Sequence, residues 1–450
     1  MKDAQRYPPG PSEVLPYTSA RQFLKDPIKM LMKLSTYGDI SHIKFGKQHV
    51  YLLNNPTYIE DILTTNYKNF IKSKGLQVSR RLLGNGLVTS EGEYHDNQRS
   101  LIQPTFYPKQ VKIYADVMLK YAQQTSDRWR EGTTIDIHKE MTKLTSAIIC
   151  KAVLGYDVNP EDDDVGDALL TCMEYFNRLL MPFGELIEKI PILPINKGFR
   201  QSKRKLDTLV FNMIEQHRKN LGKNTERNDL LYTLLEVQEQ EPGLKMTDEQ
   251  LKDEVMTIFL AGHETTANAL TWTLYLLAQH QKIGLKLYDE LKSVLGAKKN
   301  PTIGDVPKLV YAKKIITESL RLYPPAWALG RQVVKDYKVD NYSIPAGAII
   351  IMSQYVMHRD KRYFSDPEGF NPDRWTDDFK RHLPKFSYFP FGGGIRGCIG
   401  EPFALIESII IVATIYRQWN MQVDPSQKIA LKPLITLRPK YGMRMKISRR

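Results

Sequence analysis

Cysteine is scarce in this chain of 450 residues, which contains only Cys150, Cys172 and Cys398. So few cysteines cannot form a disulfide framework, and their scarcity suits a reducing compartment. Cys150 and Cys172 lie in apolar helical patterns, where a cysteine is typically buried and inert. Cys398 differs from them because glycines surround it.

Long apolar runs are also missing. No segment approaches about 18 uninterrupted apolar residues, so no transmembrane helix is predicted. Residues 1–6 are mostly charged or polar, which excludes a signal peptide. Linkers rich in Ser, Gly or Pro, internal repeats and low-complexity tracts are absent too, and 42% of the residues are hydrophobic. We therefore expect a single domain over residues 1–450 with a sizeable core.

Acidic residues are fewer than basic ones, and the formal net charge is +14. An excess of positive charge favours binding to nucleic acid, to a membrane surface or to an acidic protein. The basic residues are spread along the chain without a nucleic-acid-binding motif, so we expect no nucleic-acid partner. An acidic protein partner and a merely solvated basic surface both remain open.

The hydrophobic periodicity predicts a helix-rich chain with a few strands. Helical patterns cover 27–37, 56–66, 108–130, 138–155, 164–180, 199–221 and 247–280. Strand-like pieces cover 40–45, 50–53, 337–344 and 348–352, and a hairpin-like segment covers 431–447. Thr247 and Gln250 form a capping box that begins the longest helix.

A glycine-rich segment, FGGGIRGCIG at 391–400, places Cys398 directly before an apolar, helix-like run. Glycines allow the backbone to approach a flat cofactor closely and to adopt positive φ. A thiolate is a strong, soft iron ligand, and loop N–H groups can stabilise its charge. Arg396 can pair with a carboxylate such as a haem propionate. Cysteine in an ordinary buried glycine turn is the alternative, but the full pattern argues against it.

Phe391, Gly394, Arg396, Cys398 and Gly400 match Phe-x-x-Gly-x-Arg-x-Cys-x-Gly, the haem-binding signature of the cytochrome P-450 family, which the chain resembles. The resemblance implies a mainly α fold with small β-sheets, with a long central helix over the haem and the cysteine loop beneath it. It also implies haem b with the Cys398 thiolate as iron ligand, and cofactor contacts from the other four residues.

The predicted long helix carries AGHETT at 261–266, which is similar to the family's oxygen-activation motif. Ala261 and Gly262 keep a helix slim where it passes the iron, and a threonine hydroxyl can bond to a carbonyl one turn earlier. The resemblance implies that Thr265 stabilises the peroxo species, that Glu264 supports proton delivery and that Ala261 contacts the cofactor. His263 occupies the variable position and is assigned no chemistry.

Other residues fill family positions. Glu318 and Arg321 share a helix face, and the resemblance adds Arg374 to form a buried structural triad without a part in the reaction. His95 and Arg99 stand where the family has Trp-x-x-x-Arg, so His95 departs from the usual tryptophan. These two residues and Arg331 are expected to contact the haem propionates; surface cations are the alternative for Arg99 and Arg331.

The substrate pocket is expected to include Ala261, Trp327, Leu329 and Ile435. The loop at 76–88 and the segment 176–198 should contribute as well, and this mostly apolar lining suits an apolar molecule. Fatty acids, carotenoids or other terpenoids, and steroids all remain open, although the chain looks most like fatty-acid and carotenoid hydroxylases. The apolar stretch 183–195 could be a lid, a membrane-contacting patch or a packed loop.

The resemblance implies a monooxygenase that inserts one atom of O2 into a C–H bond of a lipid-like substrate. Electrons are expected from NAD(P)H through a reductase and a separate ferredoxin or flavodoxin. A peroxygenase or hydroperoxide isomerase would not need the pair of Glu264 and Thr265. A non-catalytic haem sensor would need an output domain, and no such domain is recognised in this sequence. Both remain alternatives.

The proline-containing segment 1–20 includes PPGP at 8–11, which resembles the hinge that follows the anchor of membrane-bound family members. No apolar anchor stands before it. We therefore expect a natural prokaryotic soluble form, monomeric and cytoplasmic, with peripheral membrane contact left open. A form from which an anchor was removed is the alternative.

Overall fold

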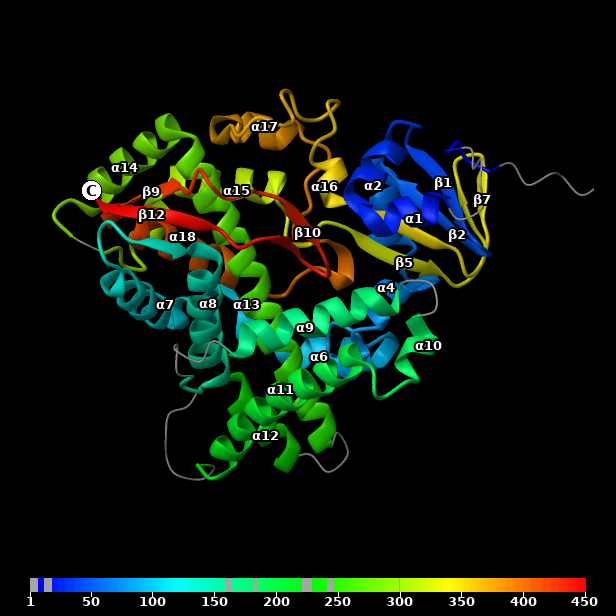
Figure 1. Cartoon of the computed structure of the whole chain (residues 1–450), viewed down its shortest axis with the longest axis horizontal. Coiled ribbons are helices and arrows are strands. Elements are labelled where there is room, and N and C mark those ends of the chain that lie inside the picture. Colours follow the sequence, from blue (N-terminus) through cyan, green and yellow to red (C-terminus); the bar gives the residue numbers. More distant parts are fainter. Residues whose placement is uncertain are drawn as a thin grey trace, which may run out of the picture. The chain divides into compact units, whose positions relative to one another are not determined.

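A computed structural model describes residues 7–11, 18–158, 164–180, 184–220, 229–240, 246–298 and 300–450 (Figure 1). Residues 1–6, on which the exclusion of a signal peptide rests, lie outside this part. The chain forms two compact units, each assembled from segments that are distant in sequence. The first unit contains residues 1–77 and 320–398, and the second contains residues 78–319 and 399–450. The expectation of a single domain stays a prediction.

The first unit is built on a mixed β-sheet with the strand order β1-β2-β8-β5-β3. Neighbouring strands are antiparallel except β2 and β8, which are parallel, with Val50 opposite Ile349. The strands of the unit are β1 (Ile40–Phe45), β2 (Gln48–Leu53), β3 (Phe70–Lys72), β5 (Leu329–Val333), β6 (Tyr337–Val339), β7 (Tyr342–Ile344) and β8 (Ile349–Met352). Its helices are α1 (Thr18–Lys25), α2 (Pro27–Ser35), α3 (Pro56–Glu60), α4 (Lys74–Gln77), α16 (Gln354–Met357) and α17 (Asp377–His382).

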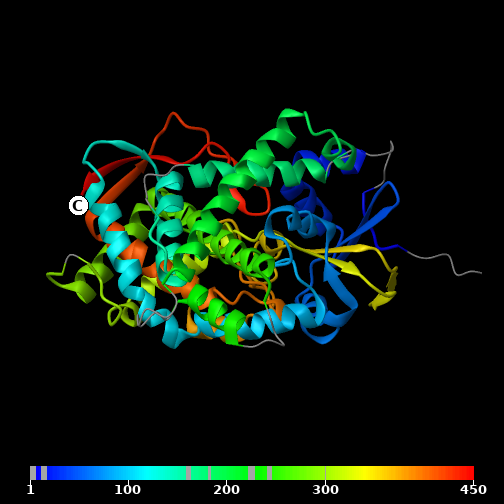
Figure 2. The same cartoon turned by 90° about the horizontal axis from the view of Figure 1, so that it is seen from below.

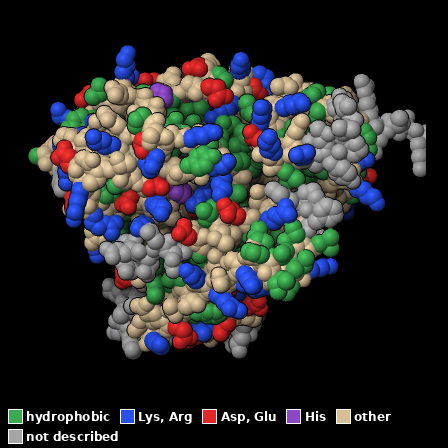
Figure 3. Space-filling view, in the orientation of Figure 1, with side chains coloured by type: hydrophobic (Ala, Val, Ile, Leu, Met, Phe, Trp, Pro, Cys, Tyr) green, Lys and Arg blue, Asp and Glu red, His purple; other side chains and the backbone are tan. Residues whose placement is uncertain are grey.

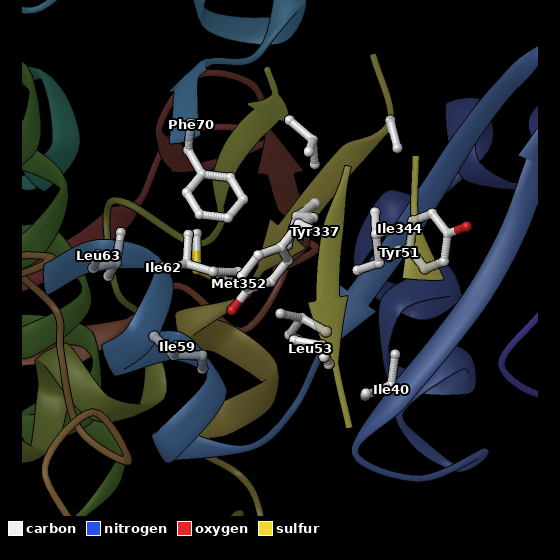
Figure 4. Close-up of a cluster of buried hydrophobic side chains, with 14 of the residues drawn as sticks. Ile40, Tyr51, Leu53, Ile59, Ile62, Leu63, Phe70, Tyr337, Ile344 and Met352 are labelled. Carbon is white, nitrogen blue, oxygen red and sulfur yellow. The ribbon is translucent and has the colours of Figure 1, made fainter. Parts of the chain in front are cut away.

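Side chains from both ends of the sequence fill the core of this unit. Figure 4 shows Tyr51 and Leu53 from β2 together with Ile344 from β7 and Met352 from β8. These four side chains are fully buried or nearly so. Burial of a large apolar side chain contributes about 1.5–3 kcal/mol, so this cluster stabilises the pairing of β2 with the distant β8.

The second unit is mainly helical. Its helices are α5 (Arg80–Leu83), α6 (Gly92–Ile102), α7 (Pro108–Arg128), α8 (Ile137–Leu154), α9 (Asp164–Leu179), α10 (Gly184–Glu188), α11 (Pro194–Arg218), α12 (Leu230–Gln240), α13 (Asp248–Gln279), α14 (Gln281–Leu295) and α18 (Glu401–Gln418), and α15 (Val310–Leu322) runs from this unit into the first. Its strands are β4 (Thr134–Asp136), β9 (Trp419–Val423), β10 (Leu431–Pro433), β11 (Leu437–Pro439) and β12 (Arg444–Arg449).

Helix α13 is the longest of these helices, and α8 lies alongside it (Figures 1 and 2). The predicted capping box at its start is confirmed, because the Gln250 N–H donates to Thr247 Oγ1 at 3.2 Å and the Thr247 N–H to Gln250 Oε1 at 2.7 Å. The Thr145 hydroxyl of α8 donates to the His263 carbonyl of α13 at 3.0 Å, which fixes the register of the two helices.

The predicted mainly α fold with small sheets is confirmed, but two local predictions are wrong in part. The predicted helix at 56–66 is present, but only Pro56–Glu60 is α-helical and Asp61–Thr65 forms a π-helical turn. The segment 431–447 is not one hairpin: β10 pairs with β11, whereas β12 pairs with β4 and β9. No helix in the described part of the chain is long and apolar enough to cross a membrane.

Candidate functional site

The glycine-rich loop of the first unit has a backbone that side chains would obstruct. Gly392 and Gly394 adopt φ values of 71° and 65°. A Cβ on Gly394 would lie 1.8 Å from the Leu63 carbonyl oxygen, so only glycine fits there. The loop is closed by the Cys398 N–H, which donates to the Phe391 carbonyl at 2.9 Å. The conformation of the loop therefore depends on its glycines, and the cofactor contacts of Phe391 and Gly394 stay a prediction.

Cys398 is exposed, in contrast to the two other cysteines. Burial raises the pKa of the Cys150 and Cys172 thiols, which keeps both protonated, in agreement with their predicted inertness. On the other side of the loop, the Gly400 carbonyl accepts the Ala404 N–H at 2.9 Å as α18 begins. The fold thus presents one accessible sulfur at the end of a glycine cradle.

His358 supports this loop, and the sequence analysis missed it. The Phe389 N–H donates to His358 Nε2 at 2.9 Å, two residues before the loop begins. Burial, together with the Arg321 guanidinium, holds the pKa of His358 well below its usual range. A neutral imidazole is required here, because only an unprotonated Nε2 can accept the N–H.

The three residues of the predicted structural triad differ in burial, and their association stays a prediction. Glu318 and Arg321 are fully buried on α15, and Arg374 is half-buried. Arg321 donates to the carbonyls of His358, Pro367 and Gly369 at 2.6–2.9 Å. Arg374 donates to Ser365 and Asp366 at 2.6 and 3.0 Å. The two arginines therefore fasten the same segment, 365–369, which gives their architectural role a physical basis.

Two cations lie directly opposite each other in the sheet of the first unit. Lys72 on β3 pairs in register with Arg331 on β5, and both are buried, with 6% and 9% exposure. Like charges at directly opposed positions of two strands repel each other. Arg331 was predicted to bind a propionate. Lys72 was not predicted, because the strand that it pairs with lies more than 250 residues away in the sequence.

In the second unit, the Thr265 hydroxyl donates to the Ala261 carbonyl at 2.9 Å, which is the predicted bond to the preceding turn. Helix α13 nevertheless continues without a break. Ala261 is exposed, and Gly262 has a packing role that the sequence analysis did not foresee. A Cβ on Gly262 would lie 2.6 Å from Ile149 Cγ1, so this glycine allows α8 to approach α13 closely.

Glu264 is almost completely buried, with 1% exposure, and its carboxylate is surrounded by polar groups. Its Oε1 accepts the Asn268 amide at 2.9 Å and the Thr436 hydroxyl at 3.0 Å, and it lies 3.4 Å from Arg438 Nε. His138 Nε2 lies 3.2 Å from Asn268 Oδ1. Burial and the nearby Arg438 lower the pKa of His138, so this ring is neutral.

Neither the three partners of Glu264 nor His138, which contacts Asn268, was foreseen. Thr436 lies in the β10–β11 turn, Arg438 lies on β11 and His138 lies in the first turn of α8, so the network joins three distant segments. Asn268 alone carried a sequence signal, since it stands four residues after Glu264 on the same helix.

His95 and Arg99 occupy α6 at helical i,i+4 spacing, which places them on one side of that helix. His95 is buried, and its Nδ1 lies 3.0 Å from Asp96 Oδ1. Arg99 donates to Gln103 Oε1 at 3.0 Å. Arg396, by contrast, lies in the first unit, in the 3₁₀ turn Gly394–Arg396 of the cysteine loop.

The predicted substrate residues have different surroundings. Leu329 begins β5, and its Cδ1 would lie 3.6 Å from a Cβ on Gly392, so it borders the cysteine loop. Trp327 packs against the core cluster that contains Met30 and Leu31. In the second unit, Ala261 and Ile435 are both exposed.

The apolar stretch 183–195 is exposed in part; residues 181–183 lie outside the described part. Leu186, Ile190 and Ile192 are 57%, 45% and 73% exposed, which argues against a packed loop at these positions. Figure 3 shows hydrophobic side chains gathered where α10 lies in Figure 1. On the same face, Lys and Arg side chains are interspersed with Asp and Glu.

The first unit thus combines an exposed cysteine in a glycine-rich loop with arginines that hold the segment 365–369. The family model for cytochrome P450 matches residues 8–445. The chain belongs to the cytochrome P450 family. The predicted enzyme class, an oxidoreductase of the monooxygenase type, is confirmed by this membership and by relatives that are named as oxygenases.

Similar proteins include bacterial enzymes matched along most of their length. Cyclooctatin synthase of Streptomyces melanosporofaciens is 33% identical over 415 residues, covering 92% of this chain and 89% of the relative. Cyclooctat-9-en-7-ol 5-monooxygenase of the same organism is 31% identical, covering 93% and 89%. Pentalenene oxygenase of Streptomyces avermitilis is 31% identical, covering 96% and 95%.

The family implies a haem with a thiolate ligand, and the residues present fit such a group. An exposed sulfur stands at the end of a loop whose glycines leave no room for side chains. The opposed, buried cations Lys72 and Arg331 suit the carboxylates of propionates.

Proposed function

We propose that this chain binds haem b through the Cys398 thiolate and hydroxylates a hydrophobic, terpenoid-like molecule with O2. The observation that carries the proposal is the single accessible thiol, Cys398, in a loop shaped by positive-φ glycines. A haem with a thiolate ligand supplies the chemistry that favours O–O cleavage.

The residues of the chain bind the cofactor and move protons. Arg331, Arg396, His95 and Arg99 are proposed to bind the propionates by charge-assisted hydrogen bonds. The Thr265 hydroxyl, half-exposed on α13, would be available as a hydrogen-bond donor to O2 in exchange for its bond to the Ala261 carbonyl. Glu264 can accept and release a proton while Asn268 and Thr436 hold its carboxylate in place.

A terpenoid-like substrate is favoured because the names of two relatives describe the oxygenation of pentalenene and of cyclooctat-9-en-7-ol. The proposed contacts, Ala261, Leu329, Ile435 and Trp327, are apolar, and such a lining suits a largely hydrocarbon ligand. The exposed apolar residues Leu186, Ile190 and Ile192 support peripheral contact with a membrane, from which such a substrate would enter.

Electrons are proposed to come from NAD(P)H through a separate reductase and a ferredoxin or flavodoxin. The net charge of +14 suits an acidic carrier of this kind. The low number of cysteines supports a cytoplasmic location, where thiols stay reduced.

The test of the ligand assignment is Cys398→Ser. The reduced carbon monoxide complex of the wild type should show the red-shifted absorption band of a thiolate ligand, and the variant should lose it. Cys172→Ser, at a buried position, is the matched control and should keep the band. A Cys398→Ser variant that retains the band would remove the assignment.

Thr265→Ala tests the proposed proton route. The variant should divert electrons from product to hydrogen peroxide, because the hydroxyl that donates to bound oxygen is gone. Thr266→Ala is the matched control, since the Thr266 side chain is buried and donates to Gly262. Unchanged coupling of electrons to product in Thr265→Ala would contradict the role.

A further inference from the structure

A cavity of about 310 Å³ lies within the second unit, between α8, α9 and the segment that follows β10. Its wall combines an apolar part, including Val165, Leu170 and Leu209, with a strongly charged part. None of the residues assigned above to oxygen chemistry or propionate binding lines it. The cavity is therefore separate from the proposed catalytic site, although Arg438, which lines the cavity, lies near Glu264.

The charged part of the wall is mainly basic. Among the described residues, five cationic side chains line it, against two carboxylates: Lys139, Lys143, Lys432, Arg438 and Lys440 against Asp136 and Asp167. Lys432 pairs with Glu174 outside the wall and Arg438 lies near Glu264, so part of this positive charge is already offset. The described lining is therefore moderately basic, which is compatible with an anionic occupant.

Arg438 is the innermost of these cations, and its side chain is only 7% exposed. Its Nε lies 3.4 Å from Glu264 Oε1, but its Nη1 is buried without a hydrogen-bond partner in the part of the chain that the structure describes. A buried charged donor without an acceptor is costly, so one is expected to be supplied. A carboxylate offers two acceptor oxygens in the geometry that a guanidinium prefers.

We propose that this cavity binds a small organic monocarboxylate, with the carboxylate on Arg438 and a short aliphatic chain against Leu170 and Leu209. At about 30 Å³ for each water-sized group, the cavity accommodates on the order of ten non-hydrogen atoms. Hexanoate has the required charge, length and apolar chain.

Binding at Arg438 is coupled to Glu264, because both carboxylates share one guanidinium. By linkage, an occupant that attracts Arg438 weakens its hold on Glu264, and the reverse holds equally. An effect of the ligand on turnover rests on the proposed function of Glu264. Binding of the ligand does not rest on that function, so binding and turnover are measured separately.

The experiment titrates the holoprotein with hexanoate by isothermal calorimetry while the haem absorption is recorded. We expect saturable one-to-one binding without a change of spin state, since a spin shift would place hexanoate at the substrate site instead. Hexanol should not compete, because it lacks the charge. Inorganic phosphate should compete poorly, because it lacks the chain; equal competition would overturn the assignment to an organic monocarboxylate.

Two variants locate the site. Arg438→Met removes the charge, and Leu170→Trp fills the apolar end without touching the ion pair. Each should weaken hexanoate binding at least tenfold, whereas Arg444→Met, at a half-exposed arginine outside the cavity, should leave it unchanged. If Arg438→Met does not fold, Leu170→Trp by itself tests whether hexanoate binds in this cavity. No binding by the wild type, or wild-type affinity in Leu170→Trp, would overturn the proposal.

Discussion

Glu407 offers a sharp test of how burial controls protonation in this fold. It lies on α18, is fully buried, and neither carboxyl oxygen has a hydrogen-bond partner in the described part of the chain. Burial raises its pKa well above the ordinary value of 4.5, and the neighbouring Thr266 hydroxyl only partly opposes this. The folded protein therefore holds a proton on Glu407 that the unfolded chain releases.

The sign of the pH dependence follows from this difference. As the pH rises above about 4.5, the unfolded chain gains stability by ionising Glu407 while the folded state does not. The free energy of unfolding thus falls by about 1.4 kcal/mol for each pH unit until the raised pKa is reached. Glu407→Gln abolishes this contribution, because an amide does not titrate.

The assay compares the urea unfolding of Glu407→Gln and the wild type at several pH values from about 5 to 7, followed by circular dichroism. The difference in unfolding free energy should shift in favour of the variant as the pH rises, by up to about 1.4 kcal/mol per pH unit. A buried amide without an acceptor costs about 1–3 kcal/mol, but this cost is independent of pH and does not alter the slope.

The matched control is Glu215→Gln, since Glu215 is exposed on α11. Its difference from the wild type should not change over this range. Histidines that titrate in the same range, such as the buried His358, are common to all three proteins and cancel in the differences. A flat difference for Glu407→Gln would refute the conclusion that this side chain is protonated in the folded state.

Two further predictions concern the loop and the buried ion pair. Gly394→Ala should abolish haem retention, measured by the pyridine haemochrome, because its Cβ would lie 1.8 Å from the Leu63 carbonyl oxygen. Gly347→Ala, also at positive φ but with nothing within 4 Å of its Cβ, should retain haem; equal loss in both variants would show that backbone strain alone is responsible. Arg438→Met should lower the unfolding free energy by about 3–5 kcal/mol, since it leaves the buried Glu264 charge unpaired. Adding Glu264→Gln should recover most of this loss in urea unfolding, and simple additivity of the two changes would contradict the coupling.

Much of the fold could be predicted from the sequence, because helix signals are local. The capping box of Thr247 and Gln250 and the strand at 40–45 depend on near neighbours and were predicted correctly. The prediction of a hairpin at 431–447 was wrong in part, because the pairing of β12 with β4 and β9 depends on strands elsewhere in the chain. The packing role of Gly262 was missed for the same reason, because Ile149, which it accommodates, lies on another helix.

The sequence by itself determined the cysteine loop and the Ala261–Thr266 motif, since their chemistry lies in a few contiguous residues whose spacing is visible. Only the tertiary structure decided which groups surround them. Thr436 donates a hydrogen bond to Glu264, which lies 172 positions away in the sequence, and Lys72 lies opposite Arg331 on a neighbouring strand. Burial, ion pairing and proton affinity depend on such distant neighbours, because the local dielectric and the hydrogen-bond partners exist only once the chain has folded.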